Sequence, residues 1–423
     1  MDSNRHILNP QSCDRRRFLG QSAAAAALPL LGSTFCLAGE SQPAAAKPAE
    51  YQRMIKLGVV GCGRRGSWIA KLFQDHGGYE IHGLADYFPE VANRCGDTLG
   101  VDPSRRFPGL SGYQKLIASG IEAIAIEDIP YFYAEQSRAA VEAGLHVYMA
   151  KPIATDVPGC LAIEANSALA TRKKQCFLVD YQIPTDPLNM EVRQRIGDGA
   201  LGKIAFLSTF GFASGCADPP KTATIESRMQ HLTWVNDIVL GGGYTVNFDI
   251  HALDAAVWVL GGRPLTATGL SRVCRPDPHG DAQDVCSALL EFPGGVICNH
   301  TGQSLHNNAD SFPGAPLRCQ IFGSLANALI GYTGKAYVQG GPKHFGGGEV
   351  KNLYPAGAER NIATFYDEIT QGRSANATAQ RAIDSTLTAI LVREAGARRC
   401  RLSMEELLRE NKRLEVDLSG LRA

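Results

Sequence analysis

The chain lacks an excess of charge of either sign, because 42 Lys and Arg residues balance 42 Asp and Glu residues. Proteins that bind nucleic acids or anionic membrane surfaces usually carry a basic excess. The composition therefore predicts no nucleic-acid partner and no binding to membrane surfaces. The chain also lacks zinc-binding spacings: its 12 cysteines are scattered, with no Cys-x-x-Cys pair and no Cys/His cluster. We expect no metal site.

The chain has no uninterrupted apolar run of the length that a clear membrane span needs. Its uncharged stretch, residues 22–37, is short for a span and is broken by proline and glycine. A basic segment at 14–20 precedes it and small residues follow, an order typical of a cleavable export signal. Arg15 and Arg16, followed closely by Phe and Leu, resemble a twin-arginine signal, which exports folded proteins. We expect residues 1–46 to be signal peptide and linker, and the protein to be periplasmic or otherwise exported, with no other membrane contact.

An apolar run leads straight into residues 61–66, which read Gly-Cys-Gly-Arg-Arg-Gly. In this pattern Gly61 allows a sharp turn, Gly63 lets the backbone approach a pyrophosphate, and Gly66 lets a helix pack closely on the strand. Asp86 ends the next apolar run, twenty residues past Gly66, where a carboxylate accepts hydrogen bonds from adenosine ribose hydroxyls. Together these residues predict a bound nicotinamide dinucleotide. Asp86 has no Ser or Arg directly after it, which favours NAD, with NADP as the alternative.

Two basic residues inside this motif, Arg64 and Arg65, are candidates for phosphate contacts, with plain solvent exposure as the alternative. An exported enzyme finds little free dinucleotide with which to exchange. We therefore expect a cofactor that is taken up during folding and held tightly. The reaction should return the nicotinamide to its starting oxidation state, either within each catalytic cycle or by reaction with a second substrate.

The pattern of apolar residues changes near residue 180 and predicts an α/β fold of two domains. Over 51–180, apolar runs alternate with helical stretches, which predicts a Rossmann domain with a doubly wound parallel sheet and a ligand beyond the carboxyl ends of its strands. Over 181–423, consecutive β-branched runs with hairpin turns predict a substrate-binding α+β domain with an open, mostly antiparallel sheet and C-terminal helices at 382–395 and 403–411. The expected strands are 56–60, 81–85, 123–126, 146–149 and 176–179, then 204–212, 265–273, 287–292, 296–301, 317–322 and 327–332.

Further motifs follow the glycine run in a specific order. Residues 139–147 read Ala-Ala-Val-Glu-Ala-Gly-Leu-His-Val, Lys151 precedes a proline, 198–204 read Asp-Gly-Ala-Leu-Gly-Lys-Ile, and 241–243 are three glycines. With these motifs the chain resembles the Gfo/Idh/MocA oxidoreductases, the family of glucose–fructose oxidoreductase and inositol dehydrogenase. The resemblance implies hydride transfer between a nicotinamide and a small-molecule sugar or cyclitol. It also implies a homo-oligomer, a dimer or tetramer, formed through the open sheet.

The resemblance implies two catalytic residues. The family's Glu-Lys-Pro motif falls on residues 150–152, so Lys151 is implied to touch both the substrate and the nicotinamide ribose. The family's Asp-x-x-x-His pattern falls on 247–251, so His251 is the implied acid/base. A histidine titrates near working pH, and a lysine stabilises negative charge that develops on oxygen. The alternatives are a solvated surface lysine and a satisfied core histidine.

The chain departs from the family at both motifs. Ala150 replaces the glutamate and Asn247 replaces the aspartate; on a helix Asn247 and His251 would share a face. The family's Thr-Pro-x-His segment begins here at Asp128, so Asp128 is a candidate cofactor contact, and either it or Glu127 could supply the missing negative charge. The candidates for substrate contact are Tyr131, Tyr181, Asn247 and His251.

Three functions fit these residues. The first is an exported NAD(P)-dependent oxidoreductase that acts on a sugar or sugar derivative and holds its cofactor tightly. The second is an NAD-dependent glycoside hydrolase, which oxidises the sugar transiently, eliminates the aglycone and re-reduces the product. The third, motivated by Ala150 and Asn247, is a non-catalytic paralogue that binds sugar or cofactor.

Overall fold

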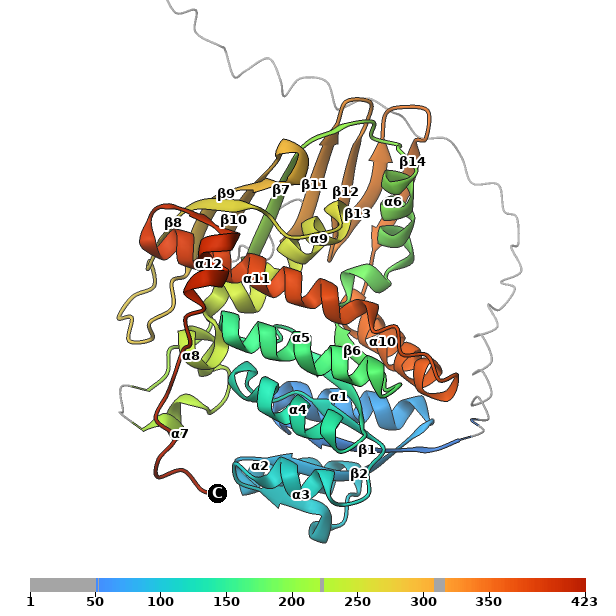
Figure 1. Cartoon of the computed structure of the whole chain (residues 1–423), viewed down its shortest axis with the longest axis vertical. Coiled ribbons are helices and arrows are strands. Elements are labelled where there is room, and N and C mark those ends of the chain that lie inside the picture. Colours follow the sequence, from blue (N-terminus) through green and yellow to red (C-terminus); the bar gives the residue numbers. More distant parts are fainter. Residues whose placement is uncertain (1–50, 52, 221–223, 308–315) are drawn as a thin grey trace, which may run out of the picture. The chain divides into compact units, whose positions relative to one another are not determined.

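The computed structural model describes residues 51, 53–220, 224–307 and 316–423. The signal peptide and linker that we expect at 1–46 lie outside these residues. Residues Ala49–Ala423 form one unit that contains two sheets and the helices packed against them (Figure 1). Among the helices described, none combines the length and the apolar character needed to cross a bilayer.

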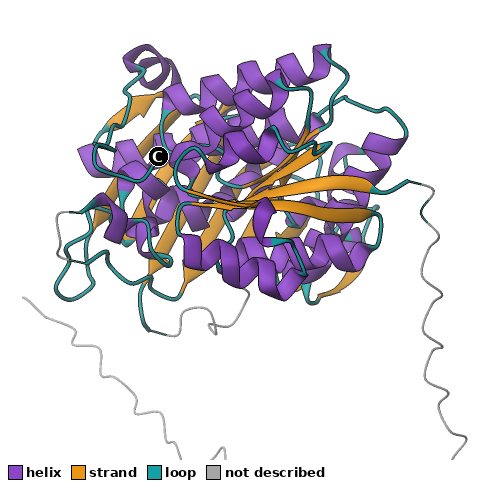
Figure 2. Ribbon diagram, turned by 90° about the horizontal axis from the view of Figure 1, so that it is seen from below, coloured by secondary structure: helices purple, strands orange, loops and turns teal. Residues whose placement is uncertain are grey.

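The first sheet has six parallel strands in the order β3-β2-β1-β4-β5-β6. The order reverses between β1 and β4, which opens a crevice at the carboxyl ends of these two strands. Helices lie on both faces of this sheet (Figure 2), as its continuous apolar strands require. The elements are β1 (Ile55–Val60), α1 (Arg64–His76), β2 (Tyr79–Asp86), α2 (Pro89–Leu99), β3 (Arg106–Pro108), α3 (Gly112–Ile117), β4 (Ala123–Ile126), α4 (Tyr133–Glu142), β5 (His146–Ala150), α5 (Val157–Arg172) and β6 (Phe177–Asp180).

The second sheet has nine strands in the order β14-β13-β12-β11-β7-β10-β9-β8-β15. Every neighbouring pair is antiparallel except β7 with β10. The expected mostly antiparallel sheet is therefore confirmed. Its elements are α6 (Pro187–Gly197), β7 (Ile204–Ala213), α7 (Ile225–Arg228), α8 (Ile238–Gly241), α9 (Ile250–Leu260), β8 (Thr266–Arg272), β9 (Val285–Phe292), β10 (Val296–Ser304), β11 (Leu317–Gly323), β12 (Asn327–Gly331), β13 (Gly334–Gln339), β14 (Phe345–Val350), α10 (Leu353–Thr370), α11 (Ala377–Arg398), β15 (Arg401–Ser403) and α12 (Met404–Glu410).

In the described part of the chain, helices cover one face of this second sheet. Helices α6, α9 and α11 contact its strands. Along β9 and β10 buried residues alternate with exposed ones, so these strands present a second face to solvent. The last helix begins with the capping box that the sequence indicates: the Ser403 hydroxyl accepts a hydrogen bond from the amide of Glu406, whose carboxylate accepts one from the amide of Ser403.

Helices from the C-terminal half also pack against the Rossmann sheet. On α10, Tyr354 stacks on Trp68 of α1 with ring centroids 4.7 Å apart. At the start of α11, the side chains of Asn376 and Thr378 accept hydrogen bonds from backbone amides of β6 at 2.7 and 3.0 Å. These bonds satisfy backbone amides at the outer edge of the parallel sheet and fix the start of α11 to β6.

Candidate functional site

The glycine loop forms one wall of a cavity of about 920 Å³. Gly61 has φ +83°, and a Cβ there would lie 2.5 Å from the backbone nitrogen of Asp128; a Cβ on Gly66 would lie 1.7 Å from the carbonyl oxygen of Gly61. At Gly63, by contrast, a Cβ would meet nothing within 4 Å. Gly63 is also the N-cap of α1 and offers no side chain to its free amides. The loop therefore fits a pyrophosphate placed against the start of α1.

Asp86 lies at the carboxyl end of β2 and lines the same cavity. One carboxylate oxygen accepts a hydrogen bond from the backbone amide of Cys62 at 2.7 Å, and the other accepts one from that of Phe88 at 2.8 Å. Burial, together with the nearby charge of Asp128, raises the pKa of Asp86 to about 6. At neutral pH Asp86 is thus mainly ionised, and its remaining lone pairs are available to ribose hydroxyls.

The two arginines of the loop lie in different surroundings. Arg64 is exposed and Arg65 is half-buried, although both line the cavity. The Nε atom of Arg65 lies 2.9 Å from Glu127, its guanidinium also pairs with Asp180, and it donates a hydrogen bond to the hydroxyl of Tyr354 at 2.6 Å. A phosphate contact by either arginine stays a prediction, but Arg65 also holds two buried carboxylates together.

The buried acids of this network lie at the carboxyl ends of two strands, β4 and β6, which β5 separates in the sheet. Glu127 directly follows β4, and Asp180 ends β6 and accepts a hydrogen bond from Asn361 at 2.6 Å. Burial raises the pKa of Glu127 to about 7, although Arg65 opposes the shift. Asp180 was not among the candidate residues. The signal that marks it is its place at the carboxyl end of a parallel strand, where ligands bind in such sheets.

Lys151 follows β5 and reaches toward the second half of the chain. Its side chain is partly buried, and its Nζ donates a hydrogen bond to the main-chain carbonyl of Asn247 at 2.6 Å. Burial lowers the pKa of Lys151 to about 7, with help from the charge of Arg65 and against the charges of Asp180 and Glu127. This environment does not match the alternative of a solvated surface lysine.

His251 lies in the first turn of α9 and is only 6% exposed. Its Nδ1 is buried and has no hydrogen-bond partner among the described residues. The rings of Tyr332 and Tyr181 lie edge-on to it, with centroids 5.1 and 6.3 Å away. Burial and the charge of Lys151 lower the pKa of His251 well below its usual range, so its imidazole is neutral at neutral pH. A core histidine normally has both nitrogens satisfied; this one has a nitrogen left for a ligand.

The backbone before His251 differs from the expectation. Residues Thr245–Asp249 form a π-helical turn, and the α-helix begins only at Ile250. The turn that holds Asn247 is therefore π-helical rather than α-helical, and that Asn247 and His251 share a face stays a prediction. Asn247 contributes its main-chain oxygen to Lys151, while its buried Nδ2 has no hydrogen-bond partner among the described residues.

Of the other residues predicted for the site, one lies beside His251 and two make contacts elsewhere. Tyr181 lies beside His251. Asp128 is partly buried and accepts hydrogen bonds from Gln136 at 2.6 Å and from the backbone amide of Ile129. The acids whose charges raise the pKa of Lys151 are Asp180 and Glu127. Tyr131 packs instead with an apolar cluster around Ile129. Within the described ranges, no group of three or more His, Cys, Asp or Glu residues is arranged to hold a metal ion.

Sequence comparisons identify the family. Residues 55–181 match a family model described as "Oxidoreductase family, NAD-binding Rossmann fold", and residues 189–328 match "GFO/IDH/MocA C-terminal domain". Together the two matches cover more than half of the chain. The chain belongs to the Gfo/Idh/MocA family. A curated relative is the inositol 2-dehydrogenase of Rhizobium meliloti (strain 1021), 26% identical over 239 residues, which are 56% of this chain and 64% of that protein. The match thus spans less than two thirds of that relative's length.

Solved structures of similar fold cover more of the chain. The scyllo-inositol dehydrogenase of Lactobacillus casei with bound NAD(H) and scyllo-inositol superposes with a TM-score of 0.63 and 17% identity, over 84% of this chain and 100% of the other. The aldose–aldose oxidoreductase of Caulobacter crescentus complexed with glycerol superposes with a TM-score of 0.65 and 20% identity, over 83% of this chain and 100% of the other. At these identities the likeness establishes the Gfo/Idh/MocA fold, a Rossmann domain followed by an open sheet.

Proposed function

We propose that this Gfo/Idh/MocA protein is an exported NAD-dependent oxidoreductase that oxidises a secondary alcohol of a sugar or cyclitol. The observation that carries the proposal is the placement of Lys151 and His251. They come from different halves of the chain, and the Nζ of Lys151 donates a hydrogen bond at 2.6 Å to the carbonyl of Asn247, in the turn that leads into His251. The charge of Lys151 lowers the pKa of His251, and the charges of Asp180 and Glu127, both paired with Arg65 of the glycine loop, raise that of Lys151. The names of the two inositol dehydrogenases described above support an alcohol of this class.

Different side chains of the site can perform the separate steps of alcohol oxidation. When bound, NAD supplies the nicotinamide ring that accepts a hydride from carbon. His251, neutral and with a buried nitrogen that has no hydrogen-bond partner among the described residues, accepts the proton of the substrate hydroxyl. Lys151, anchored by the carbonyl of Asn247, holds the same oxygen and stabilises the negative charge that develops on it. Glu127 and Asp180 favour the charged form of Lys151 and replace the carboxylate that Ala150 does not supply.

The proposal includes tight retention of the cofactor. The Arg15-Arg16 signal would export the protein already folded, and a captive cofactor must be re-reduced or reoxidised in place. The name aldose–aldose oxidoreductase, borne by a protein of the same fold, describes a reaction with this property. NAD is the proposed cofactor, because the carboxylate of Asp86 would repel a 2′-phosphate.

The deciding experiment measures cofactor and turnover together. Protein purified after export is denatured and its supernatant assayed for NAD(H) and NADP(H); we expect near-stoichiometric NAD. The native protein is then incubated with inositols, aldose pairs and nitrophenyl glycosides without added cofactor. Product formation that is lost in His251→Ala supports the proposal. Release of nitrophenol without net cofactor reduction would assign glycoside cleavage instead, and a protein that cannot bind added nicotinamide dinucleotide would be a paralogue without this activity.

Export is tested separately in the full-length chain. Replacing Arg15 and Arg16 by lysine together should retain the protein in the cytoplasm, since paired arginines are the recognised element of this signal. The measurement is the distribution of the protein between periplasmic and cytoplasmic fractions. Unchanged export of the double variant would contradict the twin-arginine assignment while leaving the enzymatic proposal untouched.

A further inference from the structure

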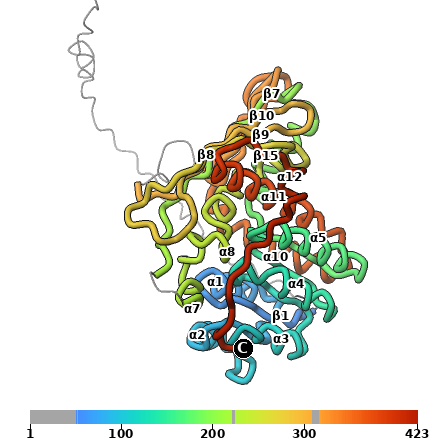
Figure 3. The backbone as a smooth tube through the Cα atoms, turned by 60° about the vertical axis from the view of Figure 1, so that its left-hand side comes forward, coloured from blue at the N-terminus to red at the C-terminus, as the bar shows by residue number. Residues whose placement is uncertain are grey.

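The chain continues beyond its last helix and returns to the Rossmann domain. Residues 412–423, here called the C-terminal strap, run from α12 toward α2 and α3 (Figures 1 and 3). At the near end, the backbone amide of Leu414 donates a hydrogen bond to Asp156 at 2.7 Å. At the far end, the amide of Leu110 donates to the carbonyl of Arg422 at 3.0 Å. Both ends of the strap are therefore fixed to the Rossmann domain.

The strap has the pattern of an extended segment with one packed side. Leu414, Val416 and Leu418 are partly buried, and the residues between them are exposed. Val416, Leu418 and Leu421 pack against the apolar cluster that contains Ile129 and Met229. The strap thus joins loops that follow β2 and β4 to the segment around α7, with its apolar side chains facing inward.

Two further contacts show that the Rossmann domain is shaped to receive the strap. The hydroxyl of Tyr87 accepts a hydrogen bond from the amide of Arg422 at 3.2 Å and donates one to Glu226 of α7 at 3.0 Å. Gly109, with φ +92°, lies so close that a Cβ would be 2.3 Å from the carbonyl oxygen of Ala423. A side chain at this position would push the strap away.

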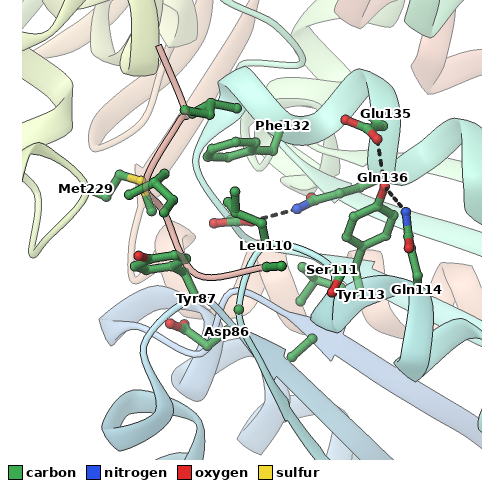
Figure 4. A pocket seen from close by; sticks show the side chains of 17 residues that line it. Asp86, Tyr87, Leu110, Ser111, Tyr113, Gln114, Phe132, Glu135, Gln136 and Met229 are labelled. Carbon is green, nitrogen blue, oxygen red and sulfur yellow. Dashed lines mark hydrogen bonds between the residues drawn. The ribbon is translucent and has the colours of Figure 1, made fainter. Parts of the chain in front are cut away.

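Beneath the strap lies a second cavity, of about 340 Å³. In Figure 4 the strap passes between Met229 and Leu110, with Tyr87 and Asp86 below it. Leu418 and Leu421 line it from the strap, and Tyr113, Phe132 and Gln136 line it from the Rossmann domain. This cavity shares four residues with the cavity of the glycine loop, namely Asp86, Tyr87, Asp128 and Met229.

The position of Asp86 identifies which end of the cofactor the strap would meet. A carboxylate at this place in the fold binds the adenosine ribose, so the cavity under the strap adjoins the adenosine end of the dinucleotide. Its mixture of aromatic walls with a few amides suits a flat base with a polar edge. Adenosine seated here could not leave outward without displacing Leu418 and Leu421.

We infer that the C-terminal strap is part of the cofactor site and that it controls how fast the dinucleotide dissociates. The inference rests on the proposed function for the identity of the ligand. Opening the strap exposes its apolar side chains and breaks its hydrogen bonds to Leu110 and Tyr87. This free-energy cost raises the barrier to dissociation of the dinucleotide. The strap thereby supplies the tight retention that an exported enzyme needs.

Two strap variants and one control test this inference. One variant ends at Arg413, and the other carries Leu418→Ser with Leu421→Ser; the control is Glu415→Ala, on the exposed side of the same segment. Each protein is loaded with NADH, and dissociation is followed by the loss of nicotinamide fluorescence after an excess of NAD is added. Thermal unfolding of each protein without cofactor shows whether the fold is kept.

We expect both strap variants to lose NADH at least about tenfold faster, equivalent to about 1.4 kcal/mol, with the rate of Glu415→Ala unchanged. Equal rates in folded wild type and folded strap variants would overturn the role of the strap and leave the proposed function standing. Slower loss or tighter binding after truncation would also overturn it, because the strap would then compete for the site. A wild-type protein that binds neither NAD nor NADP would overturn both proposals.

Discussion

Lys151 has no carboxylate beside it in the chain, since Ala150 precedes it, yet two carboxylates act on it in the fold. We predict that Lys151→Met lowers kcat about 10²–10³-fold, the loss typical when one group that stabilises a developing oxyanion is removed. NAD should still bind, because the glycine loop and Asp86 are unchanged. The measurement is NADH formation in a single turnover, beside equilibrium NAD binding. The control is Lys71→Met, an exposed lysine of α1; full activity in Lys151→Met would remove the lysine from the mechanism.

The same residue predicts a pH dependence with a definite sign. Burial and Arg65 lower the pKa of Lys151 to about 7, so the side chain loses its charge as pH rises through that value. If the charged form holds the substrate oxygen, kcat/KM falls above about pH 7. Glu127 raises the pKa of Lys151, so Glu127→Gln should move this descending limb to lower pH. Two pH–rate profiles test the prediction, and a limb at the same pH in both proteins would show that Glu127 does not act on Lys151.

At the scale of elements, the ion network of Arg65 joins α1 to β6, to the loop after β4 and to α10. We predict that Arg65→Met destabilises the protein by about 3–5 kcal/mol, because two buried carboxylates are left without their cation. Because Arg65 lowers the pKa of Glu127, its loss raises that pKa above about 7, so the destabilisation should shrink as pH falls toward about 7, where Glu127 of the variant is already protonated. Denaturant unfolding at two pH values measures both effects.

The neighbouring arginine provides the control for this prediction. Arg64→Met changes an exposed side chain and should alter the free energy of unfolding by less than about 0.5 kcal/mol. If Arg64 contacts a phosphate, this variant should weaken NAD binding without changing stability. Equal destabilisation by both substitutions would mean that the buried network contributes little.

The sequence predicted the elements whose signals are local. The glycine run, the apolar strand at 123–126 and the capping box at Ser403 each depend on a few adjacent residues, and each is found where expected. Strand β3 was missed because it is three residues long, and β14 because three successive glycines give no strand signal.

The site was less predictable, because its groups meet only in the folded chain. Glu127 follows β4 and Asp180 ends β6, so no single motif contains both acids and their common partner Arg65. The π-turn before His251 has no sequence signature, and neither has the hydrogen bond from Lys151 to the main-chain carbonyl of Asn247 within it. The strap was missed for a similar reason: its alternation of apolar and polar residues gains meaning only beside the loops that it covers.

At the scale of the whole molecule, the uncovered face of the second sheet carries a row of apolar side chains. Ile297 of β10 is the register partner of Phe206 on β7, and Phe206 stacks on Phe322 of β11 with centroids 4.4 Å apart. Phe206 and Ile297 are 38% and 43% exposed, and Leu289 of β9 is 49% exposed. A contiguous apolar surface of this kind is a common interaction site, so we predict a homodimer or homotetramer formed through this face.

If the subunits associate through this face, introducing charged side chains on it should separate them. Ile297→Asp with Leu289→Asp would place carboxylates in the contact, where burying an unpaired charge is costly, and should give monomers in light scattering. The matched control is Leu161→Asp, a 37% exposed leucine on α5 in the Rossmann domain, which should leave the assembly intact. Because His251 lies on α9, which packs on the covered face of the sheet, and the strap is fixed to the Rossmann domain, the monomer should keep its NADH dissociation rate. A monomeric wild-type protein, or an assembly that survives both aspartates, would place the interface elsewhere or remove it.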